Sequence, residues 1–189
     1  MELSNLNIKN GLCISLGANI NSKFGSPTES LIKIKPEVEL IIYKVLTDID
    51  INASRFSKES HENLFNWSSL YQTFPQGIQD TQPDFINCLL LVNSKLLDSP
   101  SVIKAKLILQ EFEKLEREFG RIKSNKKRWL PRCLDIDILW WDNLIIDDDN
   151  LTLPHPRLFH RNFVISPLSE ILSKSQKIEK LNISLWNTN

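Results

Sequence analysis

Apolar and polar residues along this chain follow two different periods, which predict strands and helices in alternation. Short apolar runs with the length and residue types of strands occur at 12–16, 66–72, 85–93 and 132–141. Two longer segments carry apolar residues at helical spacing, and each follows a helix-start signal, Ser26-Pro27-Thr28-Glu29 or Ser99-Pro100. A short third helix is expected within 151–172.

Proline and glycine positions refine these boundaries. Pro36 lacks an amide hydrogen, so it is expected to break the first helix or to begin a second segment that runs to about Thr47. Gly120 is expected to end the second helix. After the first strand, Gly17-Ala18-Asn19 predicts a turn that lets the backbone come close to a ligand or another strand.

The order strand, helix, strand, strand, helix, strand matches the split βαβ pattern of ferredoxin-like sandwiches. We therefore expect a mixed α/β (α+β) fold in which helices cover one face of an antiparallel sheet and the other face is free for ligands. A length of 189 residues suits a single domain with its own core. Such a fold serves many functions, so the chemistry must be inferred from individual side chains.

Composition excludes some classes of function. Lys plus Arg and Asp plus Glu both number 23, so no overall field draws the chain to nucleic acid or to an anionic membrane. The apolar runs are shorter than a membrane span and the N-terminal residues lack a signal-peptide pattern, so we expect a cytoplasmic protein. Three cysteines lie far apart in apolar runs, Cys13, Cys88 and Cys133, which indicates reduced core thiols.

The most informative residues are two carboxylates in the last apolar run, Asp135 and Asp137. Alternation along a strand puts them side by side on one face, with Ile136 and Ile138 on the other. Two neighbouring buried carboxylates repel each other unless a cation lies between them, and a Mg²⁺ ion with phosphate oxygens fits that requirement. The alternative is that both are solvated at a sheet end or pair with Arg132 and nearby lysines.

A basic segment lies directly before this pair of carboxylates. Six cationic side chains surround the single aromatic Trp129, namely Arg121, Lys123, Lys126, Lys127, Arg128 and Arg132. Arginine matches the planar geometry of phosphate oxygens, and such cations offset the charge that develops during phosphoryl transfer. A solvated surface loop is the alternative, but the position beside paired carboxylates favours a polyphosphate site. The chain has no Gly-x-x-x-x-Gly-Lys-Ser/Thr motif, so a P-loop does not hold those phosphates.

Several single residues are weaker candidates. Phe85 and Asn87 share one strand face, and with Phe163 they could sandwich a flat heterocycle and bind its edge, although each could also fill the core or satisfy backbone groups. His155 stands between two prolines, whose rigidity suits either ligand contact or a plain turn. Glu116 is expected at the edge of a buried helix face near the helix C-terminus, where a carboxylate is electrostatically disfavoured, with a surface ion pair as the alternative.

These residues belong to a set of motifs spread through the chain. The motifs are Leu16-Gly17-Ala18-Asn19, Tyr71 to Gly77, Gln82 to Asn87, Phe119-Gly120-Arg121, Arg128 to Asp137, and Leu153 to Pro156. The set resembles the 6-hydroxymethyl-7,8-dihydropterin pyrophosphokinase family of folate biosynthesis. The resemblance implies a pyrophosphokinase domain at 12–172, with 1–11 and 173–189 as terminal extensions. It also implies a reaction in which the pterin hydroxymethyl oxygen attacks the β-phosphorus of ATP and AMP leaves.

The resemblance further implies roles for residues at matching positions. Asp135 and Asp137 would hold two Mg²⁺ ions, and the catalytic group would be Arg121, Trp129 and Arg132. The reduced pterin would contact Thr73, Phe74, Gln76, Phe85, Asn87, Trp129 and Phe163. ATP would contact Glu116, Arg121, Lys123, Arg132, Ile138, Thr152, His155 and Arg161. Beyond these two substrates, no nucleic acid or membrane is expected as a partner, and a monomer is expected.

Some positions depart from the family pattern. Replacements or an insertion occur at Gln72, Phe74, Thr81, Glu113 and Leu130, and the region 28–66 is longer than usual. Leu130 stands where glycine is common, so the loop cannot use glycine-only backbone angles there. These departures bear on loop geometry and kinetics more than on the reaction.

Two other readings of the sequence remain open at this point. A nucleic-acid-binding ferredoxin-like module would need paired sheet aromatics and a Lys/Arg-Gly-Phe type strand motif, which the chain lacks, and it would leave Asp135 and Asp137 facing phosphates. A relative that binds pterin or nucleotide without turnover is the second reading. The intact Arg132-x-x-Asp135-x-Asp137 pattern argues against it.

Overall fold

The computed structural model describes residues 11–47, 64–75, 82–93, 99–121, 130–158 and 163–174. Within them the elements are β1 (Leu12–Ala18), α1 (Pro27–Thr47), β2 (Phe65–Trp67), β3 (Tyr71–Thr73), β4 (Phe85–Val92), α3 (Val102–Glu118), β5 (Asp135–Trp141), β6 (Ile146–Asp147) and β7 (Thr152–Leu153). Residues 163–174 form a further helix. The predicted mixed α/β fold, built in one domain around an antiparallel sheet, is confirmed.

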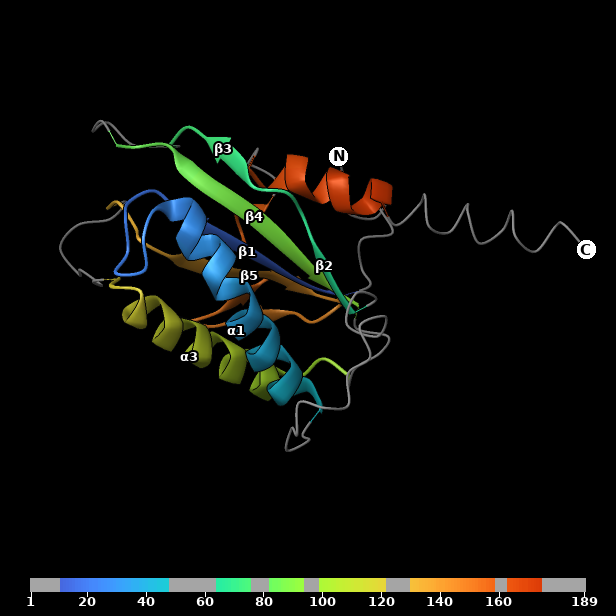
Figure 1. The fold of residues 1–189 in the computed structure, drawn as a ribbon. Coiled ribbons are helices and arrows are strands. Elements are labelled where there is room, and N and C mark those ends of the chain that lie inside the picture. The colour runs from blue at the N-terminus through green and yellow to red at the C-terminus, as the bar shows by residue number, and fades with distance from the viewer. Residues whose placement is uncertain are drawn as a thin grey trace, which may run out of the picture.

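The main sheet has the strand order β2-β4-β1-β5, and β3 also pairs with β4, along a different part of that strand from β2. Every pairing in this sheet is antiparallel. β4 is the long central partner, because β2 pairs with its C-terminal part and β3 with its N-terminal part (Figure 1). β6 and β7 form a separate two-stranded ladder.

Two helices cover one face of the sheet. α1 buries Leu31, Ile34, Val38, Ile42 and Leu46, and α3 buries Ala105, Ile108, Phe112, Leu115 and Glu116, so each helix turns one stripe inward. Their apolar stripes meet the inward residues of the strands in one core, which includes Ile136 and Ile138 of β5. The alternation predicted for β5 is therefore confirmed, with the two isoleucines facing the helices and the two aspartates facing away.

α1 runs without interruption past Pro36, so the predicted break or second segment at this proline is wrong. Proline removes one amide, and the carbonyl that this amide would have bonded belongs to Ile32, four residues earlier. Both Pro36 and Ile32 lie on the exposed side of the helix, where water can bind that carbonyl. The buried stripe on the opposite side outweighs the loss of one hydrogen bond.

The second face of the sheet is not simply free for ligands, which corrects the expectation from the sequence. The helix of residues 163–174 packs on it through Val164 and Ile171, against Leu89, Leu139 and Trp140 (Figure 1, orange-red). This apolar half of the face needs cover. The polar half, toward the start of β5 and the end of β1, holds the candidate site.

Element boundaries differ from the sequence-based ones in three places. β1 extends through Gly17 and Ala18, where a turn was predicted. The strand predicted at 66–72 is divided into β2 and β3, because Ser68 uses both its amide and its hydroxyl to bond the backbone of Leu89. α3 begins after Ser101, whose hydroxyl accepts from the Lys104 amide as an N-cap.

Two further expectations concern the cysteines and the membrane. Cys13, Cys88 and Cys133 are all buried free thiols, as expected. None of the helices in the described part of the chain has both the length and the apolar character needed to cross a bilayer.

Candidate active site

The outward face of the sheet brings together side chains from three strands. Gly17 of β1 pairs with Asn87 of β4 on one side and with Asp135 of β5 on the other. Directly opposed residues of antiparallel strands point to the same face. Asn87 and Asp135 therefore flank Gly17 in one row, with backbones about 10 Å apart at two strand spacings. In the next row Asp137 is opposite Ser15.

Asp135 opens β5 between two arginines. Arg132 forms an ion pair with its Oδ2, and Arg121 Nη1 lies 2.8 Å from its Oδ1. An ion pair with Arg132 is what the sequence-based alternative to a metal site predicted for the aspartates. Arg121 directly follows α3 and Arg132 lies shortly before β5. Asp135 therefore contacts both ends of the segment that connects α3 to β5.

Glu116 connects this arginine cluster to the edge of the sheet. Its side chain is 4% exposed, forms an ion pair with Arg121, and accepts a 2.9 Å hydrogen bond from the Ile136 amide. The alternative of a surface ion pair is therefore wrong. Glu116 satisfies an amide of β5 while holding the guanidinium of Arg121 beside Asp135, so it positions one arginine of the site.

Charge and burial act in opposite directions on these carboxylates. Burial raises the pKa of Glu116 to about 7, with the positive charge of Arg121 opposing that rise. Burial also raises the pKa of Asp135, and the nearby Asp137 carboxylate raises it further, while Arg132 and Arg121 lower it. Like charges held this close would be relieved by an additional cation.

The residues present fit a divalent cation whose remaining ligands come from a phosphate-bearing substrate and from water. In the part of the chain that the structure describes, Asp135 Oδ1 is buried without a hydrogen bond, even though Arg121 lies close to it. Among the described residues no group of three or more His, Cys, Asp or Glu side chains could form a protein-only metal site. Mg²⁺ is commonly held by one or two carboxylates plus phosphate oxygens and water, which is what two aspartates on one strand face can offer.

The predicted heterocycle-binding residues lie on the same face as the aspartates. Asn87 is 4% exposed and donates a 2.8 Å hydrogen bond to Thr73 Oγ1 on β3. A Cβ at Gly17 would lie 2.5 Å from Asn87 Oδ1 and 3.7 Å from Phe85, so the missing side chain of Gly17 leaves room for both. Phe163 packs at the border of the apolar cluster on this face.

The remaining described residues of the prediction occupy varied positions. The side chain of Ile138 is 3% exposed in the helix-side core, so only its backbone could contact a nucleotide. Phe74 is 81% exposed. Thr152 lies on β7. His155 has partners, because its amide bonds the Leu139 carbonyl at 2.7 Å and its Nδ1 accepts from the Arg157 amide.

Four predicted residues lie outside the described residues, namely Gln76, Lys123, Trp129 and Arg161. Residues 76–81 of the long connection at 73–84 and residues 122–129 of the connection at 121–131 are also outside them. What the structure does define is the anchor points of both connections.

Asn19 joins those anchor points, whereas sequence analysis assigned it only to a turn and to one of the family motifs. Its side chain donates to Pro83 O at 3.1 Å and to Gln82 Oε1 at 3.3 Å, and accepts from the Arg132 amide at 2.7 Å. Its own amide bonds Arg132 O at 2.8 Å. A buried Asn after a strand is a possible signal for such a link, but the sequence does not identify its partners.

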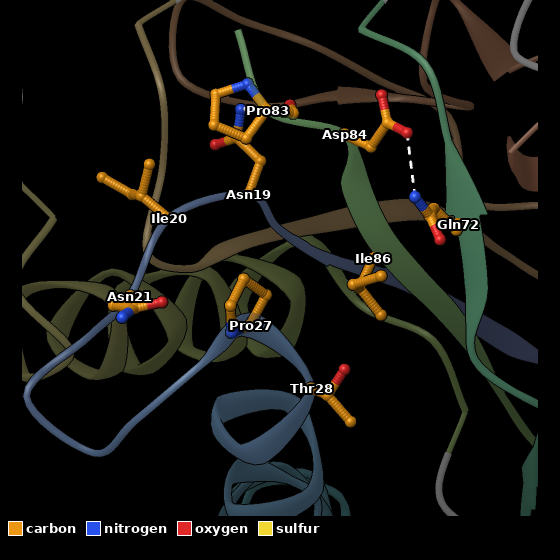
Figure 2. A pocket seen from close by; sticks show the side chains of 9 residues that line it. All are labelled: Asn19, Ile20, Asn21, Pro27, Thr28, Gln72, Pro83, Asp84 and Ile86. Atoms are coloured by element: carbon orange, nitrogen blue, oxygen red, sulfur yellow. Dashed lines mark hydrogen bonds between the residues drawn. The ribbon is translucent and has the colours of Figure 1, made fainter.

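A separate open cleft of about 620 Å³ lies at the end of the sheet near the start of α1. Its lining residues are Asn19, Ile20, Asn21, Pro27, Thr28, Gln72, Pro83, Asp84 and Ile86. Figure 2 shows Pro27 and Thr28 on one side, and the hydrogen-bonded pair Gln72 and Asp84 on the other. Ile86 belongs to the helix-side core, so this cleft opens away from Asn87 and the aspartates and contains none of the predicted site residues.

Comparison of the sequence with known proteins identifies its family. Residues 13–173 match the 7,8-dihydro-6-hydroxymethylpterin-pyrophosphokinase family. A 2-amino-4-hydroxy-6-hydroxymethyldihydropteridine pyrophosphokinase of Haemophilus influenzae is 40% identical over 117 residues, which cover 62% of this chain and 67% of that protein. The protein of the same name from Bacillus subtilis is 36% identical over 110 residues, covering 58% of this chain and 60% of its own length.

Longer relatives match as well. A folate synthesis bifunctional protein of Arabidopsis thaliana is 29% identical over 175 residues, which cover 93% of this chain but only 30% of the plant protein. The match confirms the resemblance seen in the motifs, and with it the expectation of a pyrophosphokinase of folate synthesis. The chain belongs to the 7,8-dihydro-6-hydroxymethylpterin-pyrophosphokinase family.

Proposed function

We propose that this protein transfers the diphosphate group of ATP to 6-hydroxymethyl-7,8-dihydropterin, with release of AMP. The observation that carries the proposal is the row formed by Asn87, Gly17 and Asp135. It sets a group suited to bind a heterocycle edge two strands away from a carboxylate suited to bind a metal–phosphate complex. The glycine between them has no side chain, which leaves room on this face for the side chains of Asn87 and Phe85.

The phosphate end of the site contains both signs of charge. Asp135 and Asp137 would hold two Mg²⁺ ions, which supply positive charge to the phosphate oxygens and withdraw electrons from phosphorus. Arg121 and Arg132 would contact the phosphates, with Glu116 fixing the orientation of Arg121. Because negative charge spreads over the transferred group, cations already in place stabilise it without reorganisation.

The pterin end relies on shape and hydrogen bonds. We assign Phe85 and Phe163 to stacking on the two faces of the ring. We assign its edge to Asn87 and to the backbone from Thr73 to Gln76, which includes Phe74. No strong general base lies among the described residues assigned to the pterin. Alignment of the hydroxymethyl oxygen with the β-phosphorus would therefore supply much of the acceleration, as expected for a loose transition state.

The remaining assignments complete the nucleotide side. Trp129 would close over the bound substrates, and ATP would also contact Lys123, Ile138, Thr152, His155 and Arg161. Closure of the segments 73–84 and 121–131 would exclude water, which otherwise hydrolyses ATP unproductively.

The finer structural expectations are also part of the proposal. The strand order supports a ferredoxin-like split βαβ sandwich at residues 12–172, with 1–11 and 173–189 as extensions. We further propose a cytoplasmic monomer that binds no nucleic acid and no membrane.

One experiment tests the reaction directly. The protein is incubated with Mg²⁺, ATP and reduced 6-hydroxymethylpterin, and the nucleotide product is identified, with a parallel sample lacking the pterin. Pterin-dependent AMP is expected, whereas ADP would indicate transfer of a single phosphate and would overturn the proposal. A sample containing EDTA in place of Mg²⁺ should form no product.

A further inference from the structure

Glu170 lies on the helix of residues 163–174 and accepts three hydrogen bonds from the segment that enters β3. Ser69 donates through its amide and its hydroxyl, each at 2.9 Å, and the Tyr71 hydroxyl donates at 2.9 Å. Lys174, one turn later on the same helix, forms an ion pair with Glu170. Three of the four donors therefore belong to a segment about 100 residues earlier in the chain.

These contacts are strong enough to hold a charged carboxylate. Although burial opposes it, the hydrogen bonds from Lys174, Ser69 and Tyr71 hold the pKa of Glu170 down at about 2. The carboxylate is thus ionised throughout the physiological range, and hydrogen bonds to an ionised acceptor are about twice as strong as neutral ones.

The two segments joined by Glu170 carry opposite walls of the pterin site. Tyr71 pairs with Asn87 and Thr73 pairs with Phe85 in the β3–β4 ladder. Phe163 precedes Glu170 by seven residues, which is about two helical turns, so both side chains lie on nearly the same side of the helix. Figure 1 shows this helix beside β3 and β4, on the side of the sheet away from α1 and α3.

Among the described residues, Glu170 is the side chain whose printed hydrogen bonds join the helix directly to Ser69 and Tyr71. β3 has three residues and pairs only with β4. The helix packs on the sheet through apolar side chains such as Val164, which hold it on the sheet but resist sliding or rotation less than directed hydrogen bonds do.

We infer that Glu170 is a positioning residue for pterin binding, because it fixes the helix that carries Phe163 relative to the strand that carries Thr73. This inference rests on the proposed function. Loss of the contact would change the width of the pterin site while leaving the phosphate end, where Asp135 and Arg121 lie on β5 and after α3, unchanged.

The test compares the two substrates in steady-state kinetics. In Glu170→Ala the KM for reduced 6-hydroxymethylpterin should rise about tenfold, which corresponds to about 1.4 kcal/mol, while the KM for ATP changes by less than about twofold. Tyr71→Phe removes one of the three hydrogen bonds, so a smaller rise of about threefold is expected, again for the pterin alone. Binding of oxidised 6-hydroxymethylpterin in the presence of Mg²⁺ and α,β-methylene-ATP should weaken in the same order.

Lys174→Met is the matched control on the same helix. It removes the partner of Glu170 that does not reach β3, so both KM values should stay at those of the unchanged protein. Equal changes for pterin and ATP, or a Glu170→Ala protein that behaves like Lys174→Met, would overturn the inference.

Two further outcomes are kept distinct. If Glu170→Ala does not fold, Tyr71→Phe decides the question, and an unchanged pterin KM there rejects the positioning role. If the unchanged protein forms no pterin-dependent AMP, the proposed function fails instead. Normal turnover with unaffected variants rejects only the role of Glu170.

Discussion

The substitution Gly17→Ala tests the row that joins the two ends of the site. An added Cβ would lie 2.5 Å from Asn87 Oδ1, a distance that real Cβ atoms essentially never show. The oxygen must therefore move by at least about half an ångström. Because Asn87 also donates to Thr73 at 2.8 Å, rotation of its side chain weakens or breaks that hydrogen bond.

The size of the effect follows from these two changes. A lost hydrogen bond costs about 0.5–1.5 kcal/mol, and a side chain forced off its rotamer costs a similar amount. Together they predict a loss of about 1–3 kcal/mol in the free energy of unfolding, with a fall in Tm of about 2–4 °C for each kcal/mol in a domain of this size. The KM for the pterin should rise by about tenfold, since the edge-binding amide is displaced.

A double-mutant cycle tests whether the loss of stability in Gly17→Ala arises from contact with Asn87. Asn87→Ala removes the oxygen that the new Cβ would meet, and the next contact, to Phe85 at 3.7 Å, is an ordinary one. In that background Gly17→Ala should cost almost nothing in stability, so the two substitutions should be strongly non-additive. Thermal or urea unfolding of the four proteins measures the cycle, and additive costs would refute a clash between positions 17 and 87.

Three other predictions concern charge. Asp135→Asn and Asp137→Asn should each abolish Mg²⁺-dependent turnover with the circular dichroism spectrum intact, and near-normal activity in both would reject the metal role. Arg121→Ala should slow single-turnover formation of AMP with a modest loss of substrate binding, because it removes a cation 2.8 Å from Asp135; a rate equal to that of the unchanged protein would contradict this. The pKa of Glu170 is about 2 against its ordinary 4.5, so the ionised carboxylate adds stability above about pH 4.5 that is lost as the pH falls toward 2. Glu170→Gln should therefore lose less Tm over that pH range than the unchanged protein. Curves of Tm against pH that run parallel for the two proteins would count against this prediction.

The sequence predicted local features of the fold well where one period dominates. β4 and the stripe of α3 were predicted within a residue or two, and alternation correctly put Asp135 and Asp137 on one face. Pro36 was misjudged because local propensity is weaker than the burial of a long apolar stripe. That burial depends on the sheet beneath α1, which the helix sequence does not contain.

The candidate site was predicted in part. Motifs identified the carboxylates and arginines, since their residue types and spacing depend on the chemistry alone. Glu116 was predicted at the edge of a buried helix face, with a surface ion pair as the alternative. The sequence did not decide between them, because the partner of Glu116 is the Ile136 amide on a strand that only the folded chain brings near. Glu170 went unnoticed for a similar reason: with Lys174 four residues later it looks like an ordinary surface pair.

By itself the sequence determined the family, the kinds of element and the faces on which the acidic and apolar residues lie, because these follow from periodicity and residue chemistry within short stretches. Only the tertiary structure decided which strands are neighbours, and hence that Gly17 separates Asn87 from Asp135. It also decided that a helix from the end of the chain covers half of the second face. These features depend on contacts between residues far apart in sequence, whose free energy is set by the burial and pairing of the whole chain and not by any local pattern.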